Sequence, residues 1–82
     1  MNRKEIEQKV KEILADRLDI DIKKIKLDSD LVDDLGMDSF GAVEVMYEIK
    51  EKFGIEISEE DFSSIEKVSD IVKSIYIKIK NE

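Results

Sequence analysis

The chain has 82 residues, of which 43% are charged and 41% apolar, with a formal net charge of −7 and neither cysteine nor histidine. A chain of this length encloses just enough interior for one core, so we expect a single domain over residues 1–82. Disulfide bonds and metal sites built from thiolate or imidazole ligands are excluded. The fold must therefore be held together by packing of aliphatic side chains.

The negative charge is concentrated in the middle of the chain, where residues 28–61 hold 12 acidic and 2 basic side chains. Such a field repels nucleic-acid phosphates and anionic membranes, and attracts basic protein surfaces. No apolar run approaches the roughly 20 residues that cross a bilayer, and the first residues, MNRKE, lack the apolar segment of a secretory signal. We expect a cytoplasmic monomer with no nucleic-acid partner and no membrane span.

Hydrophobic periodicity predicts a first helix from Arg3 to about Leu18. Its apolar stripe consists of Ile6, Val10, Ile13, Leu14 and Leu18. Residues 19–38 do not keep this period, and no second strand is present to pair with their partly alternating pattern. This stretch is therefore predicted to be a long loop that Leu31 and Leu35 anchor to the core at its far end.

A second helix is predicted from Ser39 to Phe53, with Asp38 as its N-cap and Gly54 in the left-handed conformation after its end. The residues near one side of it are Val43, Met46, Tyr47, Lys50 and Phe53.

Ser58 and the acidic residues after it predict the start of a short third helix that buries Phe62 and Ile65. A last helix is predicted from about Val68 to Ile79, with an apolar stripe of Val68, Ile71, Val72, Ile75 and Ile79. The fold class is therefore all-α: a four-helix bundle of three longer helices and one short helix, with a long loop between the first and second.

Ser39 lies at the mouth of the second helix, in the run Leu35-Gly36-Met37-Asp38-Ser39-Phe40. The chain has no histidine, no cysteine and no acid pair placed to activate a hydroxyl, so we expect an attachment point and not an enzyme. The alternative is that Ser39 only caps the helix, as Ser58 and Ser69 are expected to do, because helix starts favour serine.

The run Leu35-Gly36-Met37-Asp38-Ser39 resembles the Leu-Gly-x-Asp-Ser signature of acyl carrier proteins, and the resemblance extends without a gap from about Leu31 to Val72. It implies that a phosphopantetheinyl transferase, using magnesium, moves 4'-phosphopantetheine from coenzyme A onto Ser39. The resemblance further implies that this arm carries acyl intermediates as thioesters to the enzymes of fatty acid or related lipid biosynthesis.

The same resemblance implies two surfaces. Asp34, Asp38, Glu44 and Glu48 would form a docking surface for basic patches on acyl-transfer and synthase enzymes, although they could equally form a solvated helix face. Candidates for the lining of an acyl-chain cleft, or simply for the core, are Val43, Met46, Phe53, Ile57 and Phe62.

The chain departs from the family pattern at Phe40 and Gly41, and Lys50 and Lys52 dilute the acidity in the second half of the predicted second helix. Phe40 follows the serine where leucine is commoner, and Gly41 lies in the first turn of the helix at a cost of up to about 1 kcal/mol relative to alanine. These differences leave a specialised carrier (polyketide, aminoacyl or D-alanyl) as an alternative. Outside the family, the alternative is an unmodified acidic protein-interaction module.

The aspartates between residues 28 and 34 are similar to a calcium-binding loop, but the pattern fails. Asp33 stands where such a loop requires glycine, and Ser39 stands where its final glutamate belongs. No metal site is expected.

Overall fold

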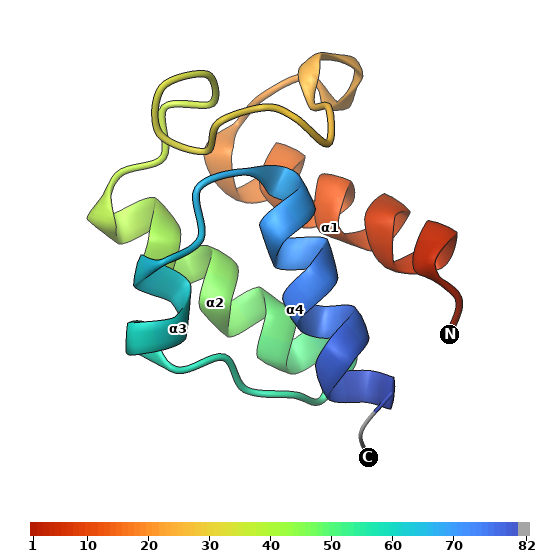
Figure 1. Cartoon of the computed structure of the whole chain (residues 1–82). Helices are drawn as coiled ribbons and strands as arrows, with labels where there is room; N and C mark the ends of the chain where they lie inside the picture. The colour runs from red at the N-terminus through yellow and green to blue at the C-terminus, as the bar shows by residue number, and fades with distance from the viewer. Residues whose placement is uncertain (81–82) are drawn as a thin grey trace.

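The computed structural model describes residues 1–80 and contains four α-helices (Figure 1). They are α1 (Arg3–Leu18), α2 (Ser39–Phe53), α3 (Glu59–Ser63) and α4 (Val68–Lys80), with a short 3-10 helix, η1 (Ile22–Lys24), after α1. The predicted all-α bundle of three longer helices and one short helix is confirmed. No helix within these 80 residues is long and apolar enough to cross a membrane.

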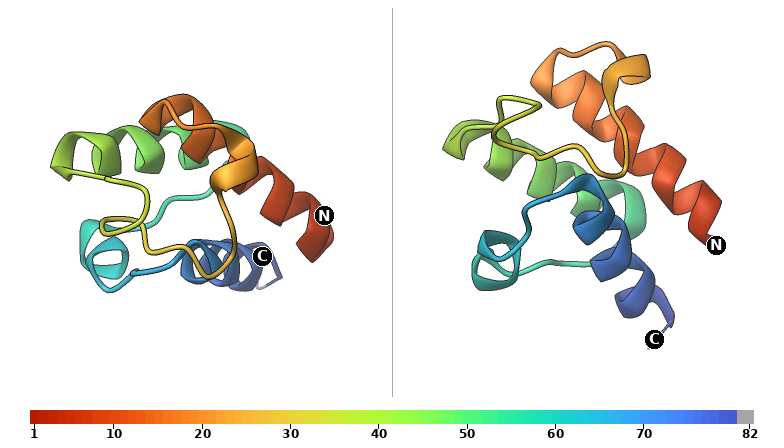
Figure 2. Two further views of the ribbon diagram at one scale, coloured as in Figure 1. Left: turned by 90° about the horizontal axis from the view of Figure 1, so that it is seen from above. Right: turned by 45° about the horizontal axis from the view of Figure 1, so that its top comes forward.

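The helices form two layers. Figure 2 shows α1 and α2 side by side in one layer and α3 and α4 in the other, with the connecting loop (residues 19–38) passing over one end of the bundle. The first turn of α1 and the last turns of α4 lie close together: the Arg3 guanidinium of α1 lies 5.6 Å from the centre of the Tyr76 ring of α4. The Lys80 ammonium, also on α4, lies 5.9 Å from the same ring.

Apolar residues of every long helix and of the connecting loop meet in one core. The predicted stripes of α1 and α4 are confirmed, with Leu18 and Ile79 half-buried at their ends. The buried core residues are Ile6, Val10, Ile13, Leu14, Ile25, Leu31, Leu35, Met37, Val45, Ile49, Ile55, Ile57, Phe62, Val68, Ile71, Val72 and Ile75.

Helix α2 buries a different set of residues from those listed near one side of it in the sequence. Its buried residues are Gly41, Val45 and Ile49, whereas Val43 and Tyr47 are exposed. Of the residues expected near one side of α2, Met46 and Phe53 are half-buried whereas Val43, Tyr47 and Lys50 are exposed, because α2 carries apolar residues around most of its circumference. Spacing alone therefore did not define which face is buried.

The connecting loop is held by backbone hydrogen bonds to the start of α4. The Val68 and Ser69 amides donate to the carbonyls of Ser29 and Leu27 at 3.1 Å and 2.9 Å, and the Leu31 amide donates to Glu66 at 2.9 Å. The predicted anchoring is confirmed, since Leu31 and Leu35 are both buried.

The helix ends follow the predicted caps with one exception. Ser58 caps α3 by accepting from the Asp61 amide, and Gly54 ends α2 with φ +68°. Ser69, however, lies inside the first turn of α4. There the carboxylate of Asp70 accepts the Lys67 and Glu66 amides at 2.9 Å and 3.0 Å, so the predicted cap at Ser69 was wrong.

Candidate functional site

Ser39 is the first residue of α2, and its side chain is exposed. The cap of this helix is its neighbour: Asp38 Oδ1 accepts the Gly41 amide at 2.8 Å, as predicted. Within residues 1–80 no hydrogen bond of the Ser39 hydroxyl is present, so the alternative in which Ser39 serves as the cap is wrong. Its hydroxyl has no structural task in the fold.

The other serine hydroxyls near turns are used within the protein. The buried Ser29 accepts the Lys26 amide at 3.0 Å, and Ser58 accepts at the start of α3. Ser63 and Ser64 donate to the carbonyls of Glu60 and Asp61 at 2.7 Å and 2.8 Å. Ser39 thus differs from the other exposed serines of residues 1–80, because its hydroxyl makes no hydrogen bond within the protein.

The backbone around Ser39 suits an anionic group on that hydroxyl. The first amides of a helix have no partner within the helix and carry a partial positive charge. Asp38 takes the Gly41 and Ala42 amides through its side chain and its carbonyl, which leaves the Ser39 and Phe40 amides at the helix end. A phosphodiester at this position would be stabilised by these amides.

Gly36 lets the connecting loop reach the helix at this angle. Its φ of +70° lies in the left-handed region that glycine adopts without strain. The turn is closed by the Gly36 amide, which donates to Val32 at 3.0 Å, and the Met37 amide, which donates to Leu31 at 2.9 Å. The turn thereby brings Asp38 and Ser39 to the surface.

A groove of about 270 Å³ runs beside Ser39, between the start of α2 and α3. Its lining is largely apolar, and consists of Val32, Met37, Asp38, Ser39, Ala42, Phe62, Ser63 and Ile65. Met37 and Phe62 are also core residues, so they form the wall between the groove and the interior. A group attached to Ser39 would start at the rim of an apolar surface.

The five predicted cleft residues do not come together. Phe62 lines the groove at Ser39, whereas Ile57 lines a separate hollow between α3 and α4. Met46 and Phe53 are half-buried against the core. Val43 is 62% exposed on the outer side of α2, so its expected place in a cleft wall or in the core was wrong.

Several residues of the groove were missed from the sequence. Met37 lies two positions before Ser39, and Ala42 lies three positions after it. The second spacing places Ser39 and Ala42 on one face of α2. That spacing was a usable signal. Val32 and Ile65 come from segments 33 residues apart in the chain, and only the folded structure brings them together.

The four predicted docking acids differ in their partners. Asp34 accepts the Asp30 amide at 2.8 Å, and Asp38 caps α2. Glu48 accepts from Arg17 Nη2 of α1 at 2.5 Å, and its side chain is only 17% exposed. Glu44 is exposed. Three of the four acids therefore also stabilise the fold.

The outer face of α2 carries apolar side chains beside these acids. Phe40 is 82% exposed, and Val43 and Tyr47 follow it at helical spacing. The Glu51 carboxylate raises the pKa of the Tyr47 hydroxyl above its usual value, because the neutral hydroxyl can donate a hydrogen bond to it, whereas ionisation would lose that bond and place two negative charges together. This face is neither fully apolar nor fully charged.

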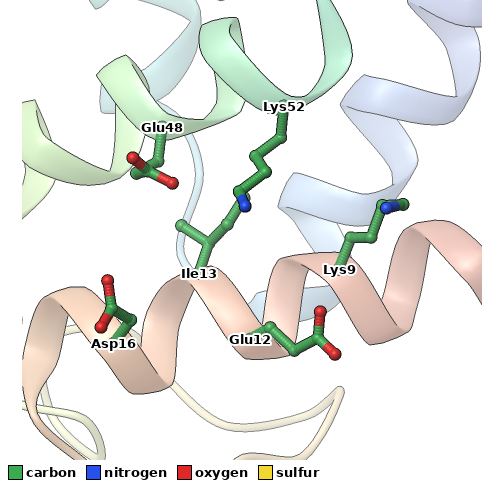
Figure 3. A pocket seen from close by; sticks show the side chains of 6 residues that line it. All are labelled: Lys9, Glu12, Ile13, Asp16, Glu48 and Lys52. Atoms are coloured by element: carbon green, nitrogen blue, oxygen red, sulfur yellow. The ribbon is translucent and has the colours of Figure 1, made fainter.

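A further hollow, of about 230 Å³, lies between α1 and α2, and its lining differs from that of the groove at Ser39. The hollow is lined by Lys9, Glu12, Ile13 and Asp16 of α1 and by Glu48 and Lys52 of α2, and Figure 3 shows the Lys52 side chain extending toward Ile13. It contains charges of both signs and no serine. It is a charged groove between two helices, and the candidate site remains at Ser39.

Comparison with known proteins agrees with this geometry. Residues 8–75 match the family model described as "Phosphopantetheine attachment site". Acyl carrier proteins of Clostridium acetobutylicum and Solidesulfovibrio magneticus are each 43% identical to the chain, over 92% and 85% of its length and 95% and 90% of theirs. A solved structure from Mycobacterium tuberculosis, described as a putative acyl carrier protein, superposes with a TM-score of 0.83 at 30% identity, covering 89% of this chain and 97% of that one.

The residues present fit 4'-phosphopantetheine. The attachment requires an accessible hydroxyl. Ser39 provides an exposed one, and because Asp38 caps the helix, modifying Ser39 breaks no hydrogen bond of the described fold. The helix amides suit the phosphodiester and the adjacent apolar groove suits the rest of the arm. With the family match over most of the chain, the protein belongs to the phosphopantetheine-binding acyl carrier proteins.

Proposed function

We propose that Ser39 is the residue that carries 4'-phosphopantetheine, and that the protein delivers acyl groups on this arm to enzymes of fatty acid or related lipid biosynthesis in the cytoplasm. The observation that carries the proposal is the division of work between two neighbours. Asp38 supplies the helix cap at 2.8 Å, and the exposed Ser39 hydroxyl beside it is left unused.

The attachment step needs only the hydroxyl from this chain. The Ser39 oxygen attacks the phosphorus of coenzyme A that bears the pantetheine, a new P–O bond forms, and 3',5'-adenosine diphosphate leaves with the electrons of the broken P–O bond. The hydroxyl proton goes to a base on the transferase, because the chain has no histidine and the carboxylate of the preceding residue, Asp38, is engaged with the Gly41 amide.

The chain's own contribution after attachment is presentation. The bound group supplies a thiol at the end of a flexible arm, on which an acyl group is held as a thioester. The amides of Ser39 and Phe40 at the helix end would hold the phosphodiester and so fix the origin of the arm. The apolar groove beside Ser39 offers the end of a folded-back arm and its acyl group a surface sheltered from water.

Partner enzymes are proposed to dock on the outer face of α2 and the loop before it. Glu44 is the acid best placed for a basic partner, since Asp34, Asp38 and Glu48 already accept internal hydrogen bonds. Contacts between exposed charges are worth about 0–1 kcal/mol each and exchange rapidly, as a shuttle requires.

The test is the intact mass of the protein after incubation with coenzyme A, magnesium and a broad-specificity phosphopantetheinyl transferase. The wild-type chain should gain one phosphopantetheine and Ser39→Ala should gain none. Ser63→Ala is the matched control, because Ser63 is exposed on the rim of the same groove, and it should load like the wild type. No gain on the folded wild-type chain would contradict the carrier function, and loading of Ser39→Ala would contradict the site.

A further inference from the structure

Two side chains separate the groove at Ser39 from the interior of the bundle. Met37 and Phe62 line the groove and belong to the buried core, at 8% and 6% exposure. The rest of the groove's apolar lining is half-buried or exposed. Met37 and Phe62 are therefore the buried lining side chains that a group would displace on passing from the groove into the core.

Of the two, Phe62 is the rigid one. Methionine is unbranched and adapts its shape to its surroundings, whereas a phenyl ring keeps its shape and turns about two bonds. Phe62 is also the buried residue of α3, a helix of five residues with the groove at Ser39 on one side and the hollow lined by Ile57 and Ile77 on the other. Its ring is what attaches α3 to the core.

The groove in front of Phe62 is small. Its volume of about 270 Å³ lies just below the roughly 300–1,000 Å³ of pockets that bury most of a drug-sized ligand. The end of an arm fixed at Ser39 and a short acyl chain can use this space. The remainder of a long chain has no further apolar surface there unless Phe62 leaves the core.

We propose that Phe62 sets the depth of the acyl-binding groove, so that the protein shelters short acyl chains and leaves the far end of long ones in water. The inference rests on the proposed function, because the acyl group reaches the groove only on an arm attached to Ser39. Tethering keeps its local concentration high, so even a small apolar groove is occupied. Phe62 acts here as a specificity-determining residue that takes no part in attachment.

The geometry gives a direct expectation for chain length. Each methylene sheltered in the groove stabilises the folded state, because the acyl chain is bound to the native protein and not to the unfolded one. Once the chain reaches the Phe62 ring, further methylenes must displace a side chain that is already buried, so they add nothing. Removing the ring opens an apolar cavity that a longer chain can fill.

The experiment loads Ser39 with acetyl-, butyryl-, hexanoyl-, octanoyl- and decanoyl-phosphopantetheine from the corresponding acyl-coenzyme A, verifies each product by intact mass, and measures Tm. In the wild type, Tm should change by less than about 2 °C from hexanoyl to decanoyl. In Phe62→Ala it should rise by roughly 6–19 °C over the same interval, as two to three extra buried methylenes would give.

Two further variants serve as controls. Phe62→Leu keeps an apolar anchor for α3 and folds if Phe62→Ala does not, and its Tm should level off at a longer chain than that of the wild type. Ile77→Ala alters the hollow on the other side of α3 and should follow the wild-type curve.

The outcomes separate the two proposals. A wild-type Tm that keeps rising through decanoyl, or Phe62→Leu and Phe62→Ala curves that level off where the wild type does, would overturn the role of Phe62 and leave the carrier function intact. A folded chain that takes up no acyl-phosphopantetheine would overturn the carrier function, and the role of Phe62 with it.

Discussion

Arg17 Nη2 on α1 donates a hydrogen bond to Glu48 Oε1 on α2 at 2.5 Å, across the seam between the two helices. This hydrogen bond is the main reason that the pKa of the Arg17 guanidinium is raised, and the charges of Glu48, Asp16 and Glu44 act in the same direction. Glu48, predicted from the sequence to face partner enzymes, thus holds two helices of the bundle together.

Replacing Glu48 by glutamine should therefore affect stability more than function. Glu48→Gln keeps the shape of the side chain but removes its charge, so Tm should fall, and the deficit should shrink as sodium chloride screens the pair. Glu44→Gln, one turn earlier on the same helix, should change Tm less. In steady-state loading by the transferase the order should reverse, with Glu44→Gln lowering kcat/KM more. Equal losses of kcat/KM would contradict the internal role assigned to Glu48.

Replacement by alanine should lower stability at Asp38 and leave it nearly unchanged at Ser39. Asp38→Ala removes the cap on the Gly41 amide and should lower the free energy of unfolding by about 1 kcal/mol. Ser39→Ala removes a hydroxyl that the fold does not use, so urea unfolding should give a value within about 0.5 kcal/mol of the wild type. A Ser39→Ala loss as large as that of Asp38→Ala would show that the serine has a capping role after all.

Gly41 should resist the usual stabilisation of a helix by alanine. A Cβ at this position would lie 2.9 Å from Leu18 Cδ2, and 3.4 Å from both Asp38 Oδ1 and Met37 Cγ. The helix propensity gain of up to about 1 kcal/mol should be offset by the shift that Leu18 must make, so that Gly41→Ala stays within about 0.5 kcal/mol of the wild type.

A double-mutant cycle tests the role of Leu18 directly. In a Leu18→Ala background the clash is absent, and Gly41→Ala should raise the free energy of unfolding by up to about 1 kcal/mol. The same small effect in both backgrounds would mean that Leu18 is not the obstacle.

Asp70 should make the start of α4 sensitive to acid. Hydrogen bonds from the Lys67 and Glu66 amides lower the pKa of Asp70 below its usual value of 3.8 in the folded protein. The folded state therefore favours the charged form, and this contribution is fully present above about pH 4 and is lost as the pH falls through the lowered pKa.

The corresponding variant is Asp70→Asn. At neutral pH it should lower the free energy of unfolding by about 1 kcal/mol, since the amide oxygen accepts more weakly than the carboxylate. Urea unfolding at successive pH values should show the gap from wild type narrowing below about pH 4. A gap that is constant down to acid pH would show that the charge of Asp70 is not what stabilises this turn.

The helix boundaries could be predicted from the sequence because they depend on local chemistry. Asp38, Ser58 and Gly54 occupy cap positions whose preference comes from one or two hydrogen bonds or from a single backbone angle. The stripes of α1 and α4 were equally clear, because polar side chains occupy their other faces.

The orientation of α2 and the lining of the groove depend on tertiary contacts. Val45 and Ile49 face the core instead of Val43 and Tyr47 because of how α2 packs against α1 and the common core, and helical spacing permits either arrangement. Arg17 meets Glu48 across 31 residues of chain. Nothing in the spacing of charges along the sequence distinguishes that pair from the many other acids and bases nearby.

The attachment of the connecting loop to α4 has a consequence for how the protein opens. The loop is the longest stretch without α-helix in residues 1–80. Three backbone hydrogen bonds nevertheless join it to residues 66–69, and its own Leu31 and Leu35 are buried in the core. Hydrogen exchange of the amides at Leu31, Val68 and Ser69 should therefore report one shared opening event. A protease should find this loop a poor substrate until the first turn of α4 has come undone as well.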